Sequence, residues 1–259
     1  MFTKTSGKLS TVLYSSPIAA CLTQRKPQFL VLGTIVTTQK KRLNGKDIDR
    51  LVKGMSKVVG KTLPSVSSIA RQKRDPFRIL VSTVLSLRTK DDVTMAASKR
   101  LFSIAPTVTE LSRTPVRAIE RAIYPVGFYK TKARSLKKIA KQLESKFDGR
   151  VPDTMDELLE FKGVGRKTAN LVITLGYGKK GICVDTHVHR ISNRLGLINT
   201  KTPEQTEYAL MEILPDKYWI GFNELLVSFG QTVCKPISPH CTTCPLEKRC
   251  PRIGVDKHR

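Results

Sequence analysis

The sequence predicts an all-α fold, and three observations support this prediction. Apolar residues recur at helical spacing, as at Ile48, Leu51 and Met55. A capping residue followed by proline marks two helix starts, at Asp75-Pro76 and at Thr202-Pro203. No run of alternating polar and apolar residues and no hairpin turn appears that would indicate a β-strand.

The other helices are predicted in order along the chain, with short turns between them. After the helix near residue 48, they are expected at 77–87, 91–104, 115–123, 131–147, 154–161, 166–177, 203–213 and 218–229. One more helix is expected directly after Asp185. Helices that alternate with short turns, and no long internal repeat, make the chain all-α from about residue 47 onward.

Composition excludes several classes of protein. Hydrophobic residues make up 40% of the 259 residues, which is typical of a folded domain and excludes low-complexity disorder for most of the chain. No apolar run reaches the ~18 residues of a membrane helix, so we expect no membrane-spanning segment. The 46 lysines and arginines exceed the 21 acidic residues and give a net charge of +25. This excess favours a polyanionic partner such as nucleic acid.

Residues 1–46 differ from the rest of the chain. They contain eight lysines and arginines, eleven serines and threonines, and no acidic residue. We expect a disordered basic extension, for which three interpretations fit equally well: a mitochondrial-type transit peptide, a DNA-binding tail, or the product of an upstream start codon. They imply different locations: cytoplasm or nucleoid in a prokaryote, nucleus or mitochondrion in a eukaryote. Without this range the remaining chain still has a net charge of +17, since 38 basic residues face 21 acidic ones.

A glycine turn precedes one of the predicted helices. Gly163 and Gly165 permit a tight turn whose backbone N–H groups, together with those of the helix start, can bind a phosphate. Val164 between them would anchor the turn in the core. Arg166 and Lys167 place two cations at the positive end of the helix, where they oppose its dipole. Because that placement is unfavourable and no packing role is evident for it, we expect an anion or a chemical reaction at this turn.

Lys167 is the candidate nucleophile. A helix N-terminus and a neighbouring cation both favour the free amine, which can attack an electrophilic carbon and form a Schiff base. The alternative role, that of a phosphate ligand, is the commoner one for a lysine in this position. Asp185, eighteen residues downstream, is either a helix N-cap or a carboxylate partner for this amine. His187 and His189 would point to different faces of a helix, which argues against a shared metal ion.

Four of the six cysteines lie within 17 residues near the C-terminus. They are Cys234, Cys241, Cys244 and Cys250. Such clustering predicts one compact metal site in a reducing compartment rather than a set of disulfides. The spacing Cys-x6-Cys-x2-Cys-x5-Cys contains one short knuckle where structural zinc sites usually have two, so iron–sulfur is favoured and zinc is the alternative. Cys21 and Cys183 match no ligand position and are expected to be free thiols.

Taken in order, these motifs resemble the endonuclease III family of helix-hairpin-helix DNA glycosylases. The matching segments are Gly163–Asn170, Val184–Val188, the four-cysteine spacing, Leu85–Asp91 and Val126–Tyr129. The similarity extends over about residues 48–253. The resemblance implies two domains: a six-helix barrel that carries the helix-hairpin-helix and a second domain around a [4Fe-4S] cluster. The barrel would be residues 69–179, and the cluster domain residues 48–68 and 180–253.

The resemblance also implies an activity. Endonuclease III removes oxidised pyrimidines from double-stranded DNA and cleaves the resulting abasic site by β-elimination. Lys167 would attack C1′ of the damaged nucleotide, and Asp185 would assist the amine and stabilise charge on the sugar. The base must leave the duplex to be reached, and the enzyme is expected to be a monomer. Two alternatives stay open: a monofunctional mismatch glycosylase, against which the lysine argues, and a non-catalytic DNA-binding module.

Further residues are expected to contact DNA by resemblance. Arg88 and Lys90 belong to a loop, and Phe128 to a turn, that enter the duplex in the family; for Phe128 the alternative is a core aromatic. Arg88 replaces the glutamine of bacterial relatives and leaves the preference for the opposite base open. Lys162 replaces a proline before the glycine turn and would add a phosphate contact, as would the turn itself and Arg166. The lysine-rich stretch 130–141 is interpreted as a solvated helix face that could follow a DNA backbone.

Overall fold

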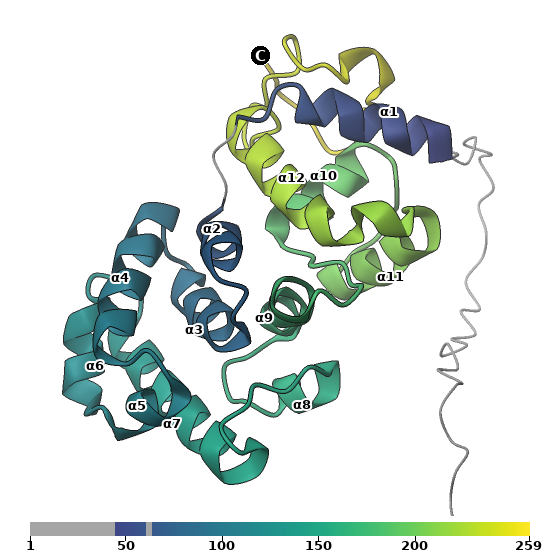
Figure 1. Cartoon of the computed structure of the whole chain (residues 1–259). Helices are drawn as coiled ribbons and strands as arrows, with labels where there is room; N and C mark the ends of the chain where they lie inside the picture. The colour runs from purple at the N-terminus through teal and green to yellow at the C-terminus, as the bar shows by residue number, and fades with distance from the viewer. Residues whose placement is uncertain (1–44, 61–63) are drawn as a thin grey trace, which may run out of the picture. The chain divides into compact units, whose positions relative to one another are not determined.

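The structure of the chain is a computed structural model that describes residues 45–60 and 64–259 (Figure 1). Within these residues all regular segments are helices and none is a strand, which confirms the all-α prediction for this part of the chain. The predicted basic extension 1–46 lies outside the described residues except for Gly45 and Lys46. These two residues belong to the first turn of the helix Gly45–Ser56, so this helix includes two residues that we assigned to the extension.

The helices follow the chain in an order close to that predicted. They are α1 (Gly45–Ser56), α2 (Ser65–Gln72), α3 (Pro76–Ser86), α4 (Asp91–Ile104), α5 (Val108–Arg113), α6 (Val116–Ile123), α7 (Tyr129–Phe147), α8 (Met155–Leu159), α9 (Arg166–Leu171), the π-helical turn η1 (Val172–Gly176), α10 (Thr186–Arg194), α11 (Pro203–Ile213), the short helix η2 (Asp216–Tyr218), α12 (Trp219–Thr232) and the short helix η3 (Glu247–Arg249). The helix expected at 166–177 is thus α9 continued by a π-helical turn.

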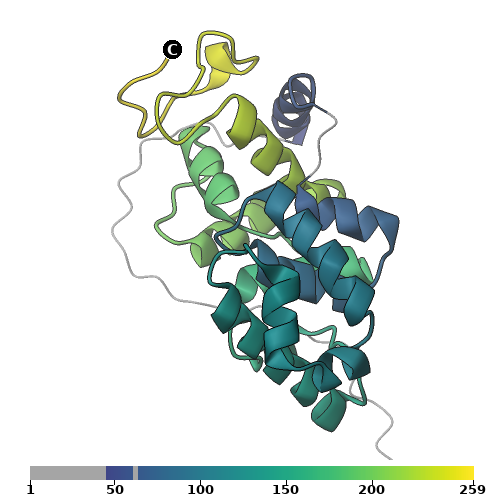
Figure 2. The same ribbon diagram turned by 90° about the vertical axis from the view of Figure 1, so that its left-hand side faces the viewer.

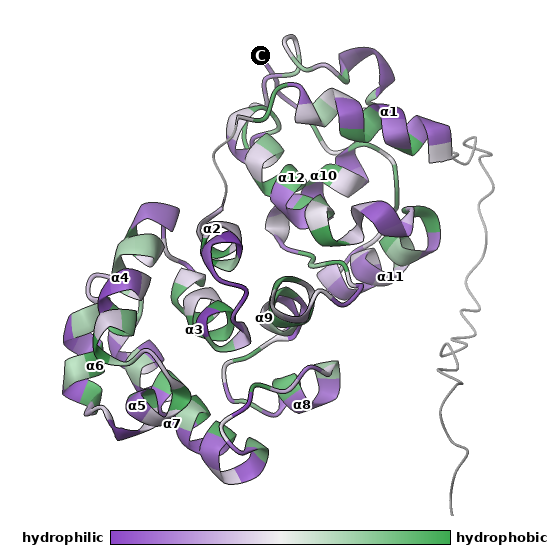
Figure 3. Cartoon of the chain, in the orientation of Figure 1, coloured by the Kyte–Doolittle hydropathy of each residue, from purple (hydrophilic) through white to green (hydrophobic). Residues whose placement is uncertain are grey.

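Helices α2 to α9 enclose one hydrophobic core. Its fully buried members include Leu80 of α3, Leu101 of α4, Ile119 of α6, Leu136 of α7 and Ala169 of α9. These helices gather in the lower part of Figure 1 and present their apolar faces inward, as the hydropathy colouring of Figure 3 shows. Burial of these apolar faces is the main source of stability for such short helices.

A second core unites the first helix with the last ones. Ile48 and Met55 of α1 pack with Val188 of α10 and Leu226 of α12. Figure 1 and Figure 2 show α1 beside α12. The helices α2 to α9 are therefore inserted between two segments that share one core. The chain leaves the second core after α1, enters the first core with α2 and returns to the second core at Ile182.

Local capping explains where several helices start. Asp75 accepts hydrogen bonds from the N–H groups of Phe77 (3.0 Å) and Arg78 (3.2 Å), with Pro76 as the first helical residue. Thr202 caps α11 in the same way, so both predicted starts are confirmed. Two helices were not predicted, α2 and α5, because eight and six residues are too few to show a clear period. For α5, the capping box formed by Thr107 and Glu110 was the signal that could have revealed it.

The lysine-rich stretch 130–141 is not uniformly solvated, and our interpretation of it was wrong in one respect. Lys132 is only 7% exposed, whereas Lys130, Arg134 and Lys138 are exposed as expected. Lys132 precedes the buried Leu136 by four residues and therefore lies on the apolar stripe of α7. This spacing was visible in the sequence and indicates burial.

Candidate active site

The glycine turn joins α8 to α9 and forms as predicted. Gly163 has φ of +95°, a conformation that favours glycine. Val164 is buried in the first core, and its N–H donates to the carbonyl oxygen of Phe161 at 2.9 Å. Gly165 stands at the N-cap of α9, and no side chain caps this helix. The first turn of α9 therefore offers its N–H groups to a ligand, whereas α3, α10 and α11 have theirs covered by side chains.

Lys167 and Asp185 lie opposite each other. The Nζ atom of Lys167 is 3.7 Å from Oδ2 of Asp185. The other carboxylate oxygen, Oδ1, accepts the N–H groups of His187 (2.9 Å) and Val188 (3.0 Å) at the start of α10. The side chain of Asp185 is 8% exposed and that of Lys167 is 39% exposed. Asp185 is thus both a helix N-cap and the carboxylate partner of the amine, so the two roles that we had set against each other coexist.

Two other titratable groups lie beside this pair. Cys183 is buried below α9, with its Sγ atom 3.7 Å from the carbonyl oxygen of Lys167. Burial raises the pKa of the Cys183 thiol far above its usual range, so it stays protonated. Burial also lowers the pKa of His187, and its ring is neutral at pH 7. At neutral pH these neighbours add no charge to the amine and the carboxylate.

Arg166 has a packing role, and the expectation that it has none was wrong. Its guanidinium donates two hydrogen bonds to the carboxylate of Glu207 in α11, at 3.0 and 3.2 Å, and lies over the ring of Tyr208. Glu207 is only 4% exposed. The pair connects α9 of the first core to α11 of the second, and it explains why a cation is tolerated at this helix start. Sequence patterns gave no sign of it, since the partners are 41 residues apart.

The loop after α3 and the turn before α7 lie side by side. The N–H of Gly127 donates to Oγ1 of Thr89 at 3.2 Å. Arg88 and Phe128 both adopt left-handed backbone conformations, with φ of 53° and 58°, and the guanidinium of Arg88 lies 5.7 Å from the centre of the Phe128 ring. Phe128 is 64% exposed, so the alternative of a core aromatic is wrong. Lys90, at the N-cap of α4, is exposed as well.

The four clustered cysteines line one cavity. Its wall also includes Arg194, whose Nη1 atom is 3.7 Å from Sγ of Cys234. Burial raises the pKa of the Cys241, Cys244 and Cys250 thiols. Among residues 45–60 and 64–259, no three ligating side chains stand close enough to hold a single metal ion. The four thiols around the shared cavity are the residues that could hold a metal group.

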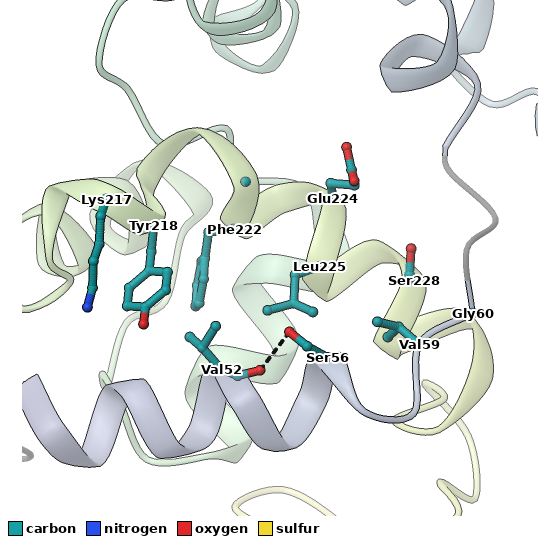
Figure 4. A pocket seen from close by; sticks show the side chains of 11 residues that line it. Val52, Ser56, Val59, Gly60, Lys217, Tyr218, Phe222, Glu224, Leu225 and Ser228 are labelled. Carbon is teal, nitrogen blue, oxygen red and sulfur yellow. Dashed lines mark hydrogen bonds between the residues drawn. The ribbon is translucent and has the colours of Figure 1, made fainter. Parts of the chain in front are cut away.

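A larger cavity lies elsewhere in the protein. It has a volume of about 300 Å³ and lies between α1 and α12 (Figure 4). Phe222 and Leu225 form its apolar side, and Ser56, in its wall, donates to the carbonyl oxygen of Val52 at 2.9 Å. Neither this cavity nor the cysteine cavity includes Lys167 or Asp185 in its wall. The side chain of Lys167 reaches the surface, with 39% exposed, whereas that of Asp185 is 8% exposed.

An all-helical protein that presents an amine and a carboxylate behind a glycine hairpin has the architecture of a helix-hairpin-helix DNA glycosylase. A family model described as "HhH-GPD superfamily base excision DNA repair protein" matches residues 81–216. Endonuclease III of Thermotoga maritima is 48% identical over 179 residues, which are 69% of this chain and 84% of that protein. Endonuclease III-like protein 1 of Bos taurus is 41% identical over 73% of this chain and 61% of its own length. The chain belongs to the endonuclease III family of this superfamily.

Solved structures agree with this assignment. A non-covalent endonuclease III–DNA complex has a TM-score of 0.71 and 34% identity, over 81% of this chain and 96% of that one. A trapped endonuclease III–DNA covalent intermediate has a TM-score of 0.69 and 32% identity, over 81% and 97%. The predicted all-α fold of this superfamily and the predicted enzyme class of DNA glycosylase and abasic-site lyase are thereby confirmed. No helix of the described residues is long and apolar enough to span a membrane.

One group of relatives is considerably longer than this chain. Endonuclease III homolog 2, chloroplastic, of Arabidopsis thaliana is 44% identical over 69% of this chain, which spans only about half (49%) of that protein. Its name gives a chloroplast location for that relative alone. In this chain, residues 1–46 lie almost wholly outside the described residues, so their interpretation as a transit peptide stays a prediction.

Proposed function

We propose that this protein removes oxidised pyrimidines from double-stranded DNA and then cleaves the abasic site, with Lys167 as the nucleophile. The observation that carries this proposal is the position of the Lys167 amine. Lys167 lies at the uncapped start of α9, and its amine is 3.7 Å from the nearly buried carboxylate of Asp185. A relative trapped as a covalent intermediate with DNA supports a nucleophile of this kind. A monofunctional glycosylase does not require a nucleophilic amine, and a docking module does not require the pair of Lys167 and Asp185.

The reaction follows from the two side chains. Asp185 accepts a proton from the Lys167 ammonium, and the free amine attacks C1′ as the N-glycosidic bond breaks. The base leaves with the bonding electron pair and takes up a proton. The C1′–O4′ bond then opens to a Schiff base, which acidifies the C2′ proton. Loss of that proton expels the 3′ phosphate and completes β-elimination, and water later hydrolyses the Schiff base to free Lys167.

The remaining predicted DNA contacts have distinct roles. The N–H groups of the turn at Gly163 and Gly165 would bind a backbone phosphate, with the exposed Lys162 beside them. Arg88 and Phe128 would enter the duplex and occupy the space of the displaced base, since both are exposed and adjacent. Arg166 contributes mainly through Glu207, which holds α9 in place.

Cys234, Cys241, Cys244 and Cys250 would hold a [4Fe-4S] cluster. The fit rests on the shared cavity that these four thiols line. When bound, the cluster would crosslink four positions of the segment 234–250. In the described structure the regular element of this segment is the three-residue helix η3. The two cores would then correspond to the barrel domain expected at residues 69–179 and the cluster domain expected at residues 48–68 and 180–253, except that the barrel begins at Ser65, since Val66 of α2 is buried in the first core.

The proposed function is tested by borohydride trapping on duplexes that contain an abasic site or a single damaged base. Reduction of a Schiff base fixes the protein to DNA, so we expect a covalent adduct visible as a shifted band on a denaturing gel. Oxidised pyrimidines should yield adduct and cleaved strand, whereas thymine or uracil mismatches should not. Excision without adduct would indicate the monofunctional alternative, and binding without either product would indicate a docking module.

The cluster is tested by metal analysis of the purified protein. We expect about four irons per chain and a broad visible absorbance. Cys250→Ser should lower the iron content, because it removes a ligand, whereas Cys183→Ser removes a thiol outside the cavity and should leave it unchanged. Stoichiometric zinc without iron would overturn the assignment.

A further inference from the structure

Lys132 of α7 is a buried lysine that the reaction above does not use. Its side chain reaches across to the end of α3 and the loop after it, where Nζ donates to the carbonyl oxygens of Leu85 (2.8 Å) and Leu87 and to Oγ1 of Thr89 (3.1 Å). An ammonium carries three N–H donors and no acceptor, so these three acceptors use all of them. Leu85 lies in the last turn of α3, and Leu87 and Thr89 belong to the short loop that follows, which also carries Arg88.

Burial of this lysine is costly. The residue is 7% exposed, and this burial lowers the pKa of Lys132 to about 8. A methionine or leucine on the same apolar stripe would avoid this cost. Retention of a cation here indicates that its hydrogen bonds serve a purpose beyond filling the core.

The loop that Lys132 holds is in contact with the turn that carries Phe128. Oγ1 of Thr89 receives hydrogen bonds from both Lys132 and the N–H of Gly127. The backbones are so close that a Cβ atom on Gly127 would lie 2.6 Å from the carbonyl oxygen of Arg88. Left-handed conformations at Arg88 and Phe128, with φ of 53° and 58°, are unfavourable for non-glycine residues and persist where the surroundings fix them.

We infer that Lys132 is a positioning residue that joins the loop of Arg88 and the turn of Phe128 into one rigid element for insertion into DNA. Lys132 does not touch the substrate; it acts through the two exposed side chains. The inference rests on the proposed function, in which Arg88 and Phe128 occupy the space of the displaced base. Its structural part, that Lys132 fixes the loop, is independent of that function.

The structural part is tested by hydrogen–deuterium exchange of the full chain. Lys132→Met keeps the length and removes all three donors, so we expect amide exchange in 85–91 and 126–129 to accelerate about tenfold or more. Lys99→Met removes an exposed lysine of α4 and should leave these peptides unchanged. If Lys132→Met does not fold, Thr89→Val serves as the second variant. It removes the shared hydroxyl while keeping the shape of the side chain, and it should accelerate exchange in the same peptides. Unchanged exchange in the folded variants would overturn the inference.

The functional part is tested by a double-mutant cycle on excision of an oxidised pyrimidine. We expect Lys132→Met to lower kcat/KM for excision about tenfold, and to do so much less in a Phe128→Ala background, because the element it positions has then lost its wedge. Strand cleavage at a preformed abasic site, which needs no base displacement, should fall less. Equal losses in both backgrounds would mean that Lys132 acts through general stability and would overturn the inference. A Phe128→Ala variant with normal excision would instead contradict the proposed insertion and leave the exchange result as the test of Lys132.

Discussion

Lys167→Ala should abolish the borohydride-trapped adduct and lower base excision by about 10⁴-fold or more. Losses of this size are typical when the nucleophile of a covalent mechanism is removed. No other amine replaces it, because Asp185 has Lys167 as its ion-pair partner at 3.7 Å and the neighbouring Arg166 is held by Glu207. The measurement is single-turnover excision and trapping on the same duplex, with enzyme in excess over DNA.

Lys162→Ala provides the matched control. Lys162 is an exposed lysine on the same hairpin, so its removal changes the charge by the same amount as Lys167→Ala. Under saturating conditions this variant should form the trapped adduct in full, although its affinity for DNA should be lower and less dependent on salt. An adduct that survives in Lys167→Ala would contradict the assignment of the nucleophile, and peptide mapping of that adduct would identify the true one.

Much of this site could be predicted from the sequence because its signals are local. The glycine turn, Lys167 and the N-cap Asp185 each lie within a few residues of the helix start that gives them meaning. Local spacing also placed the four cysteines, which line one cavity. Each of these features depends on backbone geometry over one or two turns, and such geometry is encoded by neighbouring residues.

Residues that act through distant partners could not be predicted in the same way. Arg166 was assigned to DNA because its position opposes the helix dipole, yet the structure pairs it with Glu207 in another core. Lys132 was placed on a solvated face because lysines surround it, yet it is buried against a loop 45 residues away. For Lys132 the tertiary contact overturns the prediction of exposure, and for Arg166 it overturns the expectation that the residue has no packing role, while its contact with DNA stays a prediction. For Lys132, the spacing of the apolar residues in α7 indicates burial better than the surrounding charge does, because that spacing follows the face on which the helix packs.

Asp185→Asn should separate the two roles of this residue. Asparagine is as good an N-cap as aspartate, so the free energy of unfolding should stay nearly unchanged. The amide can still accept the N–H groups of His187 and Val188, but it carries no charge to take a proton from Lys167 or to stabilise a cation on the sugar. We expect base excision to fall about 10²- to 10³-fold, measured under single-turnover conditions.

Asp185→Ala removes the charge and the cap together. Its excision rate should fall at least as far as that of Asp185→Asn, while the free energy of unfolding should drop by about 1 kcal/mol, measured by denaturant titration. The difference between the two variants is therefore the contribution of the cap, and their shared loss is the contribution of the carboxylate to catalysis. If Asp185→Asn keeps the wild-type rate, the carboxylate is only a cap, and the amine of Lys167 must be activated by its place at the start of α9. We expect instead that both variants lose excision activity and that only Asp185→Ala loses stability. This result would assign Oδ1 to the cap of α10 and Oδ2, which is 3.7 Å from Lys167, to the reaction.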